Sequence, residues 1–367
     1  MRIVLPVTND LSGDQRLRRT ASALRAAGQE VIAVGRQLPE SLPLPGTGWQ
    51  QIRMRLRFRR GKLFYLEYNL RLWLLLLRLR PAAIHANDLD TLAACWLAAR
   101  LTGARLVYDS HEYFTEVPEL LHRPLTRGIW LALERLLLPR TDAAITVSAG
   151  IAQAYAQRYG RPFAVVRNVP FRRERPAAAR EPGLLLYQGA LNTGRGVGLM
   201  IRALEHLPEY RLWIIGRGDV EAELRALAAA SAARERVIFK GFVPAEQLPG
   251  LTAQASLGFS LEEELGASYR LALPNKLFDY LQARVPVLVS DLPEMRSLVE
   301  TYGTGAVLPA AERTPEGLAA QIRALLEDPE RYARCAAACE AAAAELCWEE
   351  EQARLLAVYA PWIGTAG

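Results

Sequence analysis

Short apolar runs alternate with amphipathic segments from the first residues onward. Residues 2–7 (RIVLPV) predict a buried strand, residues 14–27 carry apolar side chains at helical spacing before Gly28, and residues 29–35 predict a second strand. Strand, helix and strand in this order predict a βαβ unit with parallel strands. The loop after the first strand, with Gly13 at its turn, is a candidate binding site, because ligands bind at the carboxyl ends of such strands. An ordinary connecting loop explains it equally well.

The same alternation continues to residue 168. Strands are predicted at 82–86, 105–109, 143–147 and 161–168, and helices at 88–101, at 120–138 and from Ser148. His111 follows a strand directly, where it could hydrogen-bond a substrate hydroxyl or stabilise a reacting centre; the alternative is a histidine that satisfies loop backbone groups. His85, inside a strand, is expected to be structural. Asp88 and Asp90 form a D-x-D triplet that could hold a metal, but we interpret Asp88 as the cap of the next helix.

Residues 53–80 combine basic residues with apolar and aromatic ones, first at strand spacing and then at helical spacing. Such a segment could lie on an anionic membrane or receive a lipid-linked substrate. The alternative is a solvated basic face over a core helix. The longest apolar run, Leu72 to Leu77, is too short to cross a bilayer, and the first residues do not resemble a secretory signal. We therefore expect a cytoplasmic protein, either free or peripheral on the inner membrane face.

The second half follows a polar, proline-bearing segment, 169–183, which we interpret as an interdomain linker. Strand 184–188 leads into GALNTGRGVGLMIRAL, where glycines surround Arg195 just before a helix. Glycine lets a backbone approach a phosphate closely, and arginine supplies a charged fork beside it. Gly189 and Arg195 are therefore candidate anion-binding residues. A lone glycine-rich turn is weak evidence, so its value depends on other residues of the same half.

The stretch 268–294 supplies those residues. Pro274 suits the first turn of a helix, because its missing N–H would have no partner there. The amides that follow, beginning at Asn275, combine with the positive helix end and with Lys276 to form an anion site. Asp279 lies one turn deeper on nearly the same face, where it can accept hydrogen bonds from hydroxyls. The run VPVLVS then predicts a buried parallel strand.

The remaining elements extend the alternation to the end of the chain. Strands are predicted at 210–216, 236–241, 256–260 and 305–308, and a last helix at 348–362. Gly216 ends the first of these strands, and Phe242 and Val243 follow the second, where they could flank a flat ring. The aromatic residues of the last helix suit packing on the first half of the chain.

Composition adds limits on the class of protein. With 367 residues, 51% hydrophobic and 23% charged, the chain is a globular protein long enough for two domains. Its net charge of +6 favours anionic partners. Lys276 is one of three lysines, the others being Lys62 and Lys240. The four cysteines are too unevenly placed for a disulfide framework and lack companions for a zinc set.

Six segments in series resemble the retaining family 4 glycosyltransferases, and the match covers most of the chain. They are residues 9–31, 85–94, 106–116, 187–204, 237–248 and 273–294. The resemblance implies an α/β protein with the GT-B architecture, in which two Rossmann-like domains face each other across a cleft. The expected divisions are an acceptor domain at 1–168, a linker at 169–183, a nucleotide-sugar domain at 184–346 and a helix at 347–367 that returns to the N-terminal domain.

The same resemblance implies transfer of a sugar from a nucleotide-diphosphate donor to a saccharide or lipid-linked acceptor, in cell-envelope or exopolysaccharide synthesis. It implies retention of the anomeric configuration, and it involves no metal, no cofactor and no nucleic acid. Arg195 and Lys276 would hold the diphosphate, His111 would face the sugar, and these three would be catalytic. The other residues expected to bind the donor are Gly13, Gly189, Gly216, Phe242, Val243, Asn275 and Asp279.

The sequence departs from the family pattern at two positions. The first glutamate of the family's glutamate pair would fall at Leu271, while Asp279 stands at the second. Ala190 stands where a basic residue is often found. The leucine motivates an alternative function, a catalytically weak relative that binds a nucleotide sugar or glycan as a partner protein. A Rossmann dehydrogenase also fits the strand pattern, but the chain lacks the spaced glycine fingerprint after its first strand.

Overall fold

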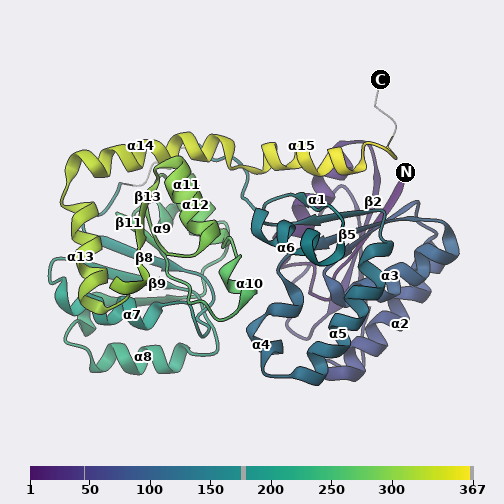
Figure 1. Ribbon diagram of the computed structural model, residues 1–367, viewed down its shortest axis with the longest axis horizontal. Helices are drawn as coiled ribbons and strands as arrows, with labels where there is room; N and C mark the ends of the chain where they lie inside the picture. Colours follow the sequence, from purple (N-terminus) through teal and green to yellow (C-terminus); the bar gives the residue numbers. More distant parts are fainter. Residues whose placement is uncertain (45, 175–178, 364–367) are drawn as a thin grey trace. The chain divides into compact units, whose positions relative to one another are not determined.

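The computed structural model describes residues 1–44, 46–174 and 179–363. It divides the chain into two compact units, one formed by Met1–Asn168 with Glu351–Gly367 and the other by Val169–Glu350. The segment interpreted as a linker, 169–183, is grouped with the second unit, and its residues 175–178 lie outside the described part of the chain. Figure 1 shows the elements of each unit.

The first unit contains a seven-stranded parallel sheet in the order β3-β2-β1-β4-β5-β6-β7. Its strands are β1 (Arg2–Pro6), β2 (Glu30–Gln37), β3 (Gln50–Arg55), β4 (Ala83–Asn87), β5 (Arg105–Ser110), β6 (Ala143–Thr146) and β7 (Ala164–Val165). Its helices are α1 (Gln15–Ala26), α2 (Gly61–Leu79), α3 (Leu89–Thr102), α4 (Pro118–Leu121), α5 (Pro124–Leu137), α6 (Ala149–Tyr159) and α15 (Trp348–Tyr359).

The strand order of this sheet reverses between β1 and β4. The chain runs outward from β1 to β3, returns to β4 on the other side of β1, and then continues to β7. In open parallel sheets such a switch point leaves a crevice at the carboxyl ends of the strands, where ligands bind. The loops after β1, β4 and β5 therefore form one neighbourhood, although they are distant in sequence.

Three predictions differ from the structure in the position or extent of a helix or strand. The helix expected at 120–138 is two helices, α4 and α5, because Pro124 begins a new helix and cannot continue the old one. The strand expected at 161–168 pairs only at Ala164–Val165. Pro274 is not in the first turn but caps helix α11 (Asn275–Gln282) with extended backbone.

The last helix, α15, packs on the first unit, as the aromatic residues suggested. The hydroxyl of Tyr359 lies 2.6 Å from Nδ1 of His85 in β4, and both side chains are fully buried. Glu351, also buried, accepts hydrogen bonds from the backbone and side chain of Arg167. The helix thus contributes polar contacts inside the first unit as well as apolar ones.

The second unit contains a six-stranded parallel sheet in the order β10-β9-β8-β11-β12-β13. Its strands are β8 (Leu184–Gln188), β9 (Arg211–Ile215), β10 (Val237–Gly241), β11 (Leu257–Ser260), β12 (Val287–Ser290) and β13 (Gly305–Leu308). With α11, its helices are α7 (Val197–Ala203), α8 (Glu221–Ala230), α9 (Leu248–Thr252), α10 (Ala267–Arg270), α12 (Pro293–Tyr302), α13 (Pro315–Leu326) and α14 (Pro329–Glu345). Its order reverses between β8 and β11, which defines a second switch point.

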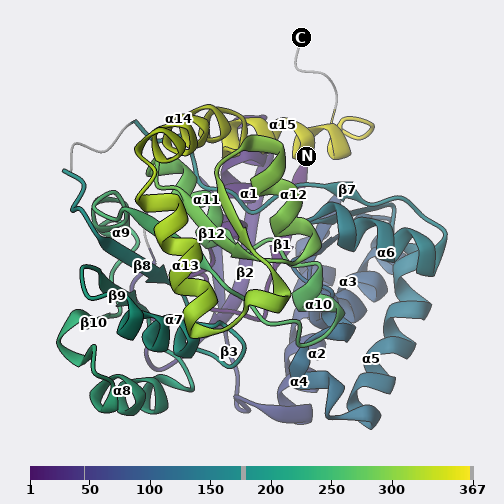
Figure 2. The ribbon, with the colours of Figure 1, turned by 60° about the vertical axis from the view of Figure 1, so that its left-hand side comes forward.

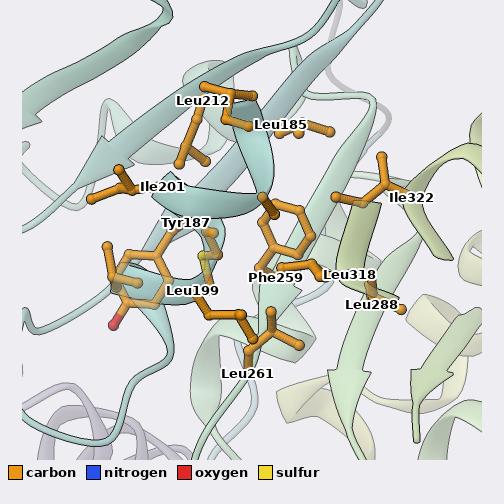
Figure 3. Packing of buried hydrophobic residues seen from close by; sticks show 14 of the residues in the cluster. Leu185, Tyr187, Leu199, Ile201, Leu212, Phe259, Leu261, Leu288, Leu318 and Ile322 are labelled. Carbon is orange, nitrogen blue, oxygen red and sulfur yellow. The ribbon is translucent and has the colours of Figure 1, made fainter. Parts of the chain in front are cut away.

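Side chains along the strands of the second unit alternate between the two faces of the sheet and form two hydrophobic cores. Leu185 and Tyr187 join a cluster with side chains of α7, α8 and α13, whereas Leu184 and Leu186 join a cluster with side chains of α11 and α12. Successive strand residues point to opposite faces, so one strand serves both cores. Figure 2 shows the helices around this sheet, and Figure 3 shows part of the first cluster, with Phe259 among the strand and helix side chains.

The contact between α15 and β4 generates a prediction. Tyr359→Phe removes the hydroxyl that faces buried His85 and leaves a buried ring nitrogen without that partner. We expect the first unit to lose about 1–3 kcal/mol of unfolding free energy. The matched control is Tyr302→Phe, because the hydroxyl of Tyr302 bonds exposed Glu345. Thermal and urea unfolding of the two variants measure the difference, and equal stability of the two variants would contradict the predicted contribution.

Candidate functional site

Three glycines lie side by side at the carboxyl ends of β8, β9 and β10. The amide of Gly189 donates to the carbonyl of Ile215, and the amide of Gly216 donates to the carbonyl of Gly241, both at 2.9 Å. Gly189 and Gly216 have φ of +140° and +141°, and a Cβ on Gly216 would lie 1.9 Å from the carbonyl oxygen of Gly189. Only glycine tolerates this geometry. The sheet edge therefore presents bare backbone beside the second switch point.

A buried carboxylate and two cations lie next to this glycine row. Glu262 follows β11, and its Oε1 lies 2.7 Å from Nζ of Lys276 and 3.5 Å from Nη1 of Arg195. Ser260 donates to the other carboxylate oxygen at 2.6 Å. Lys276 comes from the first turn of α11 and Arg195 from the loop before α7. Sequence-distant residues thus meet where the strand order reverses.

Charge and packing fix this cluster in place. Burial alone would raise the pKa of Glu262, but Lys276, Ser260 and Arg195 together hold that pKa below its usual range. The Lys276 ammonium also lies 4.4 Å from the ring centroid of Tyr187, and the Arg195 guanidinium lies 4.9 Å from that of Tyr269. Because two cations share one carboxylate, the cluster retains a positive charge that can hold an anion. Lys276 is therefore a buried cation that is paired with Glu262.

Asp279 lies on the other side of the β8 end. Its carboxylate faces Nε2 of Gln188 at 3.4 Å and Nη1 of Arg173 at 3.5 Å, and a quarter of its side chain is exposed. Gln188 is the last residue of β8, directly before Gly189. Asn275 is exposed at the start of α11. The structure therefore brings five predicted residues to the end of β8: Gly189, Arg195, Gly216, Lys276 and Asp279.

The remaining predicted donor-binding residues are Phe242, Val243 and Gly13. Phe242 is 69% exposed after β10, while the adjacent Val243 packs against the core under α11. Gly13 lies in the first unit, where its amide contacts the carbonyl of Asp10 at 3.4 Å. Its backbone φ is not positive and a Cβ there would meet open space, so the chain conformation alone does not require glycine at this position.

The first switch point carries a second cluster, centred on His111. Nδ1 of its ring lies 3.1 Å from Asp88, and Nε2 lies 3.2 Å from Oδ1 of Asn87 and 3.5 Å from Asp109. Strand pairing explains this meeting, because Asn87 at the end of β4 is in register with Asp109 in β5. Acceptors face both ring nitrogens, so both must carry protons, and His111 is an imidazolium.

Asp88 has a different role from the one that the sequence predicted. It occupies the cap position of α3, but its side chain makes no capping hydrogen bond there. One of its carboxylate oxygens instead accepts the backbone N–H of His111 at 2.9 Å, and the other faces the His111 ring. Asp90, the other acidic residue of the triplet, accepts a 2.6 Å hydrogen bond from Thr8 after β1.

A buried ionic network contacts the His111 ring through Asp109. Asp109 accepts two hydrogen bonds from Arg16, at 2.7 and 2.8 Å, and a third group, Nε2 of His85, lies 3.1 Å away. Burial would raise the pKa of Asp109, but Arg16 and His111 hold it well below its usual range. His85, itself bonded to Tyr359, is thus part of the core, as predicted. Burial would lower the pKa of His111, but the charges of Asp88 and Asp109 raise it to about 10.

Sequence reasoning missed the carboxylates that hold these cations. Glu262 was one of three adjacent glutamates, and Asp109 read as an ordinary strand residue. A usable signal exists for both, because each is a charged residue at the carboxyl end of a predicted buried strand.

Within the part of the chain that the structure describes, no three His, Cys, Asp or Glu side chains gather as a metal site.

Comparisons with known proteins address the two halves separately. The model of glycosyl transferases group 1 matches residues 169–341, and the model of glycosyltransferase family 4 matches residues 14–170. The alpha-D-kanosaminyltransferase of Streptomyces kanamyceticus is 28% identical over 341 residues, covering 84% of this chain and 83% of that protein.

Solved structures agree on the fold. Sucrose-phosphate synthase from Thermosynechococcus elongatus superposes with a TM-score of 0.81 at 19% identity, over 98% of each chain. HepE from Anabaena, solved with UDP and glucose, has a TM-score of 0.76 at 17% identity, over 97% of this chain and 98% of that one. Because both halves match in order and over most of the sequence, the chain is a glycosyltransferase with the GT-B fold, and its first half matches the family 4 model and its second half the group 1 model.

Proposed function

We propose that the protein transfers a sugar from a nucleotide-diphosphate donor to a saccharide or lipid-linked acceptor, with retained anomeric configuration and without a metal or cofactor. The observation that carries the proposal is the cluster of Lys276, Arg195 and Glu262 at the second switch point. Its excess positive charge lies beside the bare backbone of Gly189, where a diphosphate would meet the cations and the backbone together. The complexes of HepE with UDP and with UDP-glucose support this donor class.

The chemistry of sugar transfer suits fixed cations. As the glycosidic bond breaks, negative charge grows on the departing diphosphate and positive charge grows on the anomeric carbon. Lys276, Arg195 and the first amides of α11 would stabilise the diphosphate, because groups already held in place pay no cost of reorganisation. Asp279 would accept hydrogen bonds from the ribose hydroxyls. His111 would act at the sugar or the leaving phosphate.

The test of this function is turnover across a panel of uridine and guanosine diphosphate sugars, followed by release of nucleoside diphosphate. Proton NMR of the product reads the anomeric configuration, and a parallel reaction with EDTA reads metal dependence. Retention and unchanged turnover in EDTA are expected. Binding of donors without turnover on saccharide or lipid-linked acceptors would favour the alternative, a partner protein that binds nucleotide sugars. This alternative is considered because Leu271 stands where the family has the first glutamate of its pair.

Removing the Lys276 charge should weaken nucleotide binding. Replacing Lys276 alone would leave Glu262 buried without its partner, so the informative variant is Lys276→Met combined with Glu262→Gln. We expect its affinity for UDP or GDP, whichever the wild type binds, to fall by about tenfold or more relative to Glu262→Gln alone, because a charged contact to phosphate is lost. Lys240→Met is the matched control, because Lys240 is an exposed lysine of the same unit. Isothermal calorimetry measures the nucleotide affinity of the wild type, the double variant, Glu262→Gln and Lys240→Met. Equal affinity of the double variant and Glu262→Gln would show that Lys276 is not part of the donor site.

The first unit also has a surface that suits an anionic membrane. Helix α2 is apolar on two sides: one row of side chains is buried, and a second row is exposed. The exposed row is Leu63, Leu66, Leu70 and Leu74, each between 53% and 67% exposed. Just before this row, five basic side chains are exposed: Arg55, Arg57, Arg59, Arg60 and Lys62. Exposed leucines flanked by basic residues are typical of helices that lie in a membrane interface. We name this surface, residues 55–74, the α2 face.

A membrane role for the α2 face would place the enzyme beside lipid-linked acceptors, in cell-envelope or exopolysaccharide synthesis. Helix α5, which lies next to α3 in the same layer as α2 (Figure 2), exposes Leu125, Ile129 and Leu136. None of the helices that the structure describes is long and apolar enough to cross a membrane. Binding would therefore be peripheral.

Vesicle sedimentation tests the α2 face. We expect the wild type to bind vesicles with 30% anionic lipid and to bind neutral vesicles weakly, since each basic residue near an anionic surface contributes about 1 kcal/mol. The triple variant Leu66→Ser, Leu70→Ser, Leu74→Ser should lose most of this binding. Leu42→Ser is the control, because Leu42 is equally exposed at 67% but lies outside the α2 face. Equal vesicle binding by the triple variant and the control would show that the α2 face does not bind the membrane.

A further inference from the structure

We infer that Asp88 is a positioning residue: its carboxylate fixes the ring of His111 and keeps Nδ1 protonated, so that His111 meets the substrate as a fixed cation. This inference rests on the proposed role of His111 at the sugar. It begins from three observations on one residue. Asp88 occupies a cap position without capping, accepts the backbone N–H of His111, and faces Nδ1 of its ring at 3.1 Å.

The backbone of Asp88 is strained to make these contacts. Its φ is +58° with ψ of 167°, a region that residues other than glycine rarely adopt. Strain of this kind persists only where the surroundings enforce it, and it gathers at functional sites. Here it directs the side chain toward His111, which follows β5, and away from the first turn of α3. A helix cap would have required no such conformation.

The two nitrogens of the His111 ring have different hydrogen-bond partners. Nδ1–H has one acceptor, the Asp88 carboxylate, at 3.1 Å. Nε2–H faces Asn87 at 3.2 Å and Asp109 at 3.5 Å, and Asp109 is already bonded to Arg16. Both partners of Nε2 are buried, whereas a quarter of the Asp88 side chain is exposed. Asp88 therefore anchors the ring through Nδ1, while the buried groups hold Nε2.

The charges around the ring favour the same state. Asp88 comes from the loop after β4, Asp90 from the first turn of α3, Asp109 from β5 and Glu112 from the loop that carries His111. Asp88 and Asp109 supply the negative charge that acts on the ring, whereas burial raises the pKa of Asp90 and of Glu112 to about 7. The cation Arg16 is paired with Asp109. The pKa of His111, raised to about 10, reflects this setting. An imidazolium cannot accept a proton, so His111 would act by charge and hydrogen bonding and not as a general base.

Asp88→Asn tests the inference, because asparagine retains an acceptor for the His111 backbone and removes the charge. NMR titration of the histidine rings, with His111→Gln used to assign the signal, reads the ring directly. We expect the His111 ring of the wild type to stay protonated through pH 8 and the ring of Asp88→Asn to titrate at least one pH unit lower than in the wild type. Above its new pKa the variant should lose kcat by about tenfold per pH unit and regain it in acid, with donor KM changed less than twofold.

Two companion variants separate positioning from loop geometry. Asp88→Gly relieves the backbone strain and removes both carboxylate contacts, so it should fold but share the lowered His111 pKa. Asp142→Asn is the matched control, because Asp142 also accepts a backbone N–H, from Leu106, and pairs with Arg105 in the same unit. An unchanged His111 titration in both Asp88 variants would overturn the inference. A wild type without turnover would contradict the proposed function instead, because the titration needs no substrate.

Discussion

A carboxylate taken out of water must be met by positive charge and hydrogen-bond donors, and both clusters of this protein are built around that requirement. In the first unit the buried carboxylate is Asp109, which gathers Arg16, His85 and His111. In the second it is Glu262, which gathers Lys276, Arg195 and Ser260. Glu262 lies just beyond β11, which adjoins the second switch point, and Asp109 lies near the end of β5, the neighbour of β4 at the first. Each carboxylate therefore fixes cations at a place where a parallel sheet is open to ligands.

The fold could be predicted because its signals are local. Apolar runs marked most strands, glycines marked the ends of helices, and two successive series of strands indicated two units. The errors have local causes as well: Pro124 divides a helix whose apolar pattern continues through it, and Pro274 lies one residue before the helix that it introduces. The last helix was predicted to pack on the first unit because of its aromatic residues. Tyr359 makes one such contact, with His85.

The sites could be predicted only in part, because their partners are distant in sequence. Lys276 and Arg195 stood out as cations near helix starts, yet nothing local indicates that both reach Glu262. Asp88 was assigned to a helix cap because aspartate favours that position, but its positive φ and its contacts with His111 show that the side chain is directed elsewhere. The register of β4 with β5 decides which acid meets His111. Register is a property of the folded sheet, and sequence pattern constrains it weakly for strands buried on both faces.

The row of Gly189, Gly216 and Gly241 has a consequence for which substitutions this end of the sheet tolerates. The amides of Gly189 and Gly216 bond carbonyls at the ends of the next strands, and a Cβ on Gly216 would lie 1.9 Å from the carbonyl oxygen of Gly189. A side chain on Gly216 would have to displace backbone, so this position cannot vary without moving the strand ends. Under the proposed function, differences in sugar preference would then arise from the loops around the row.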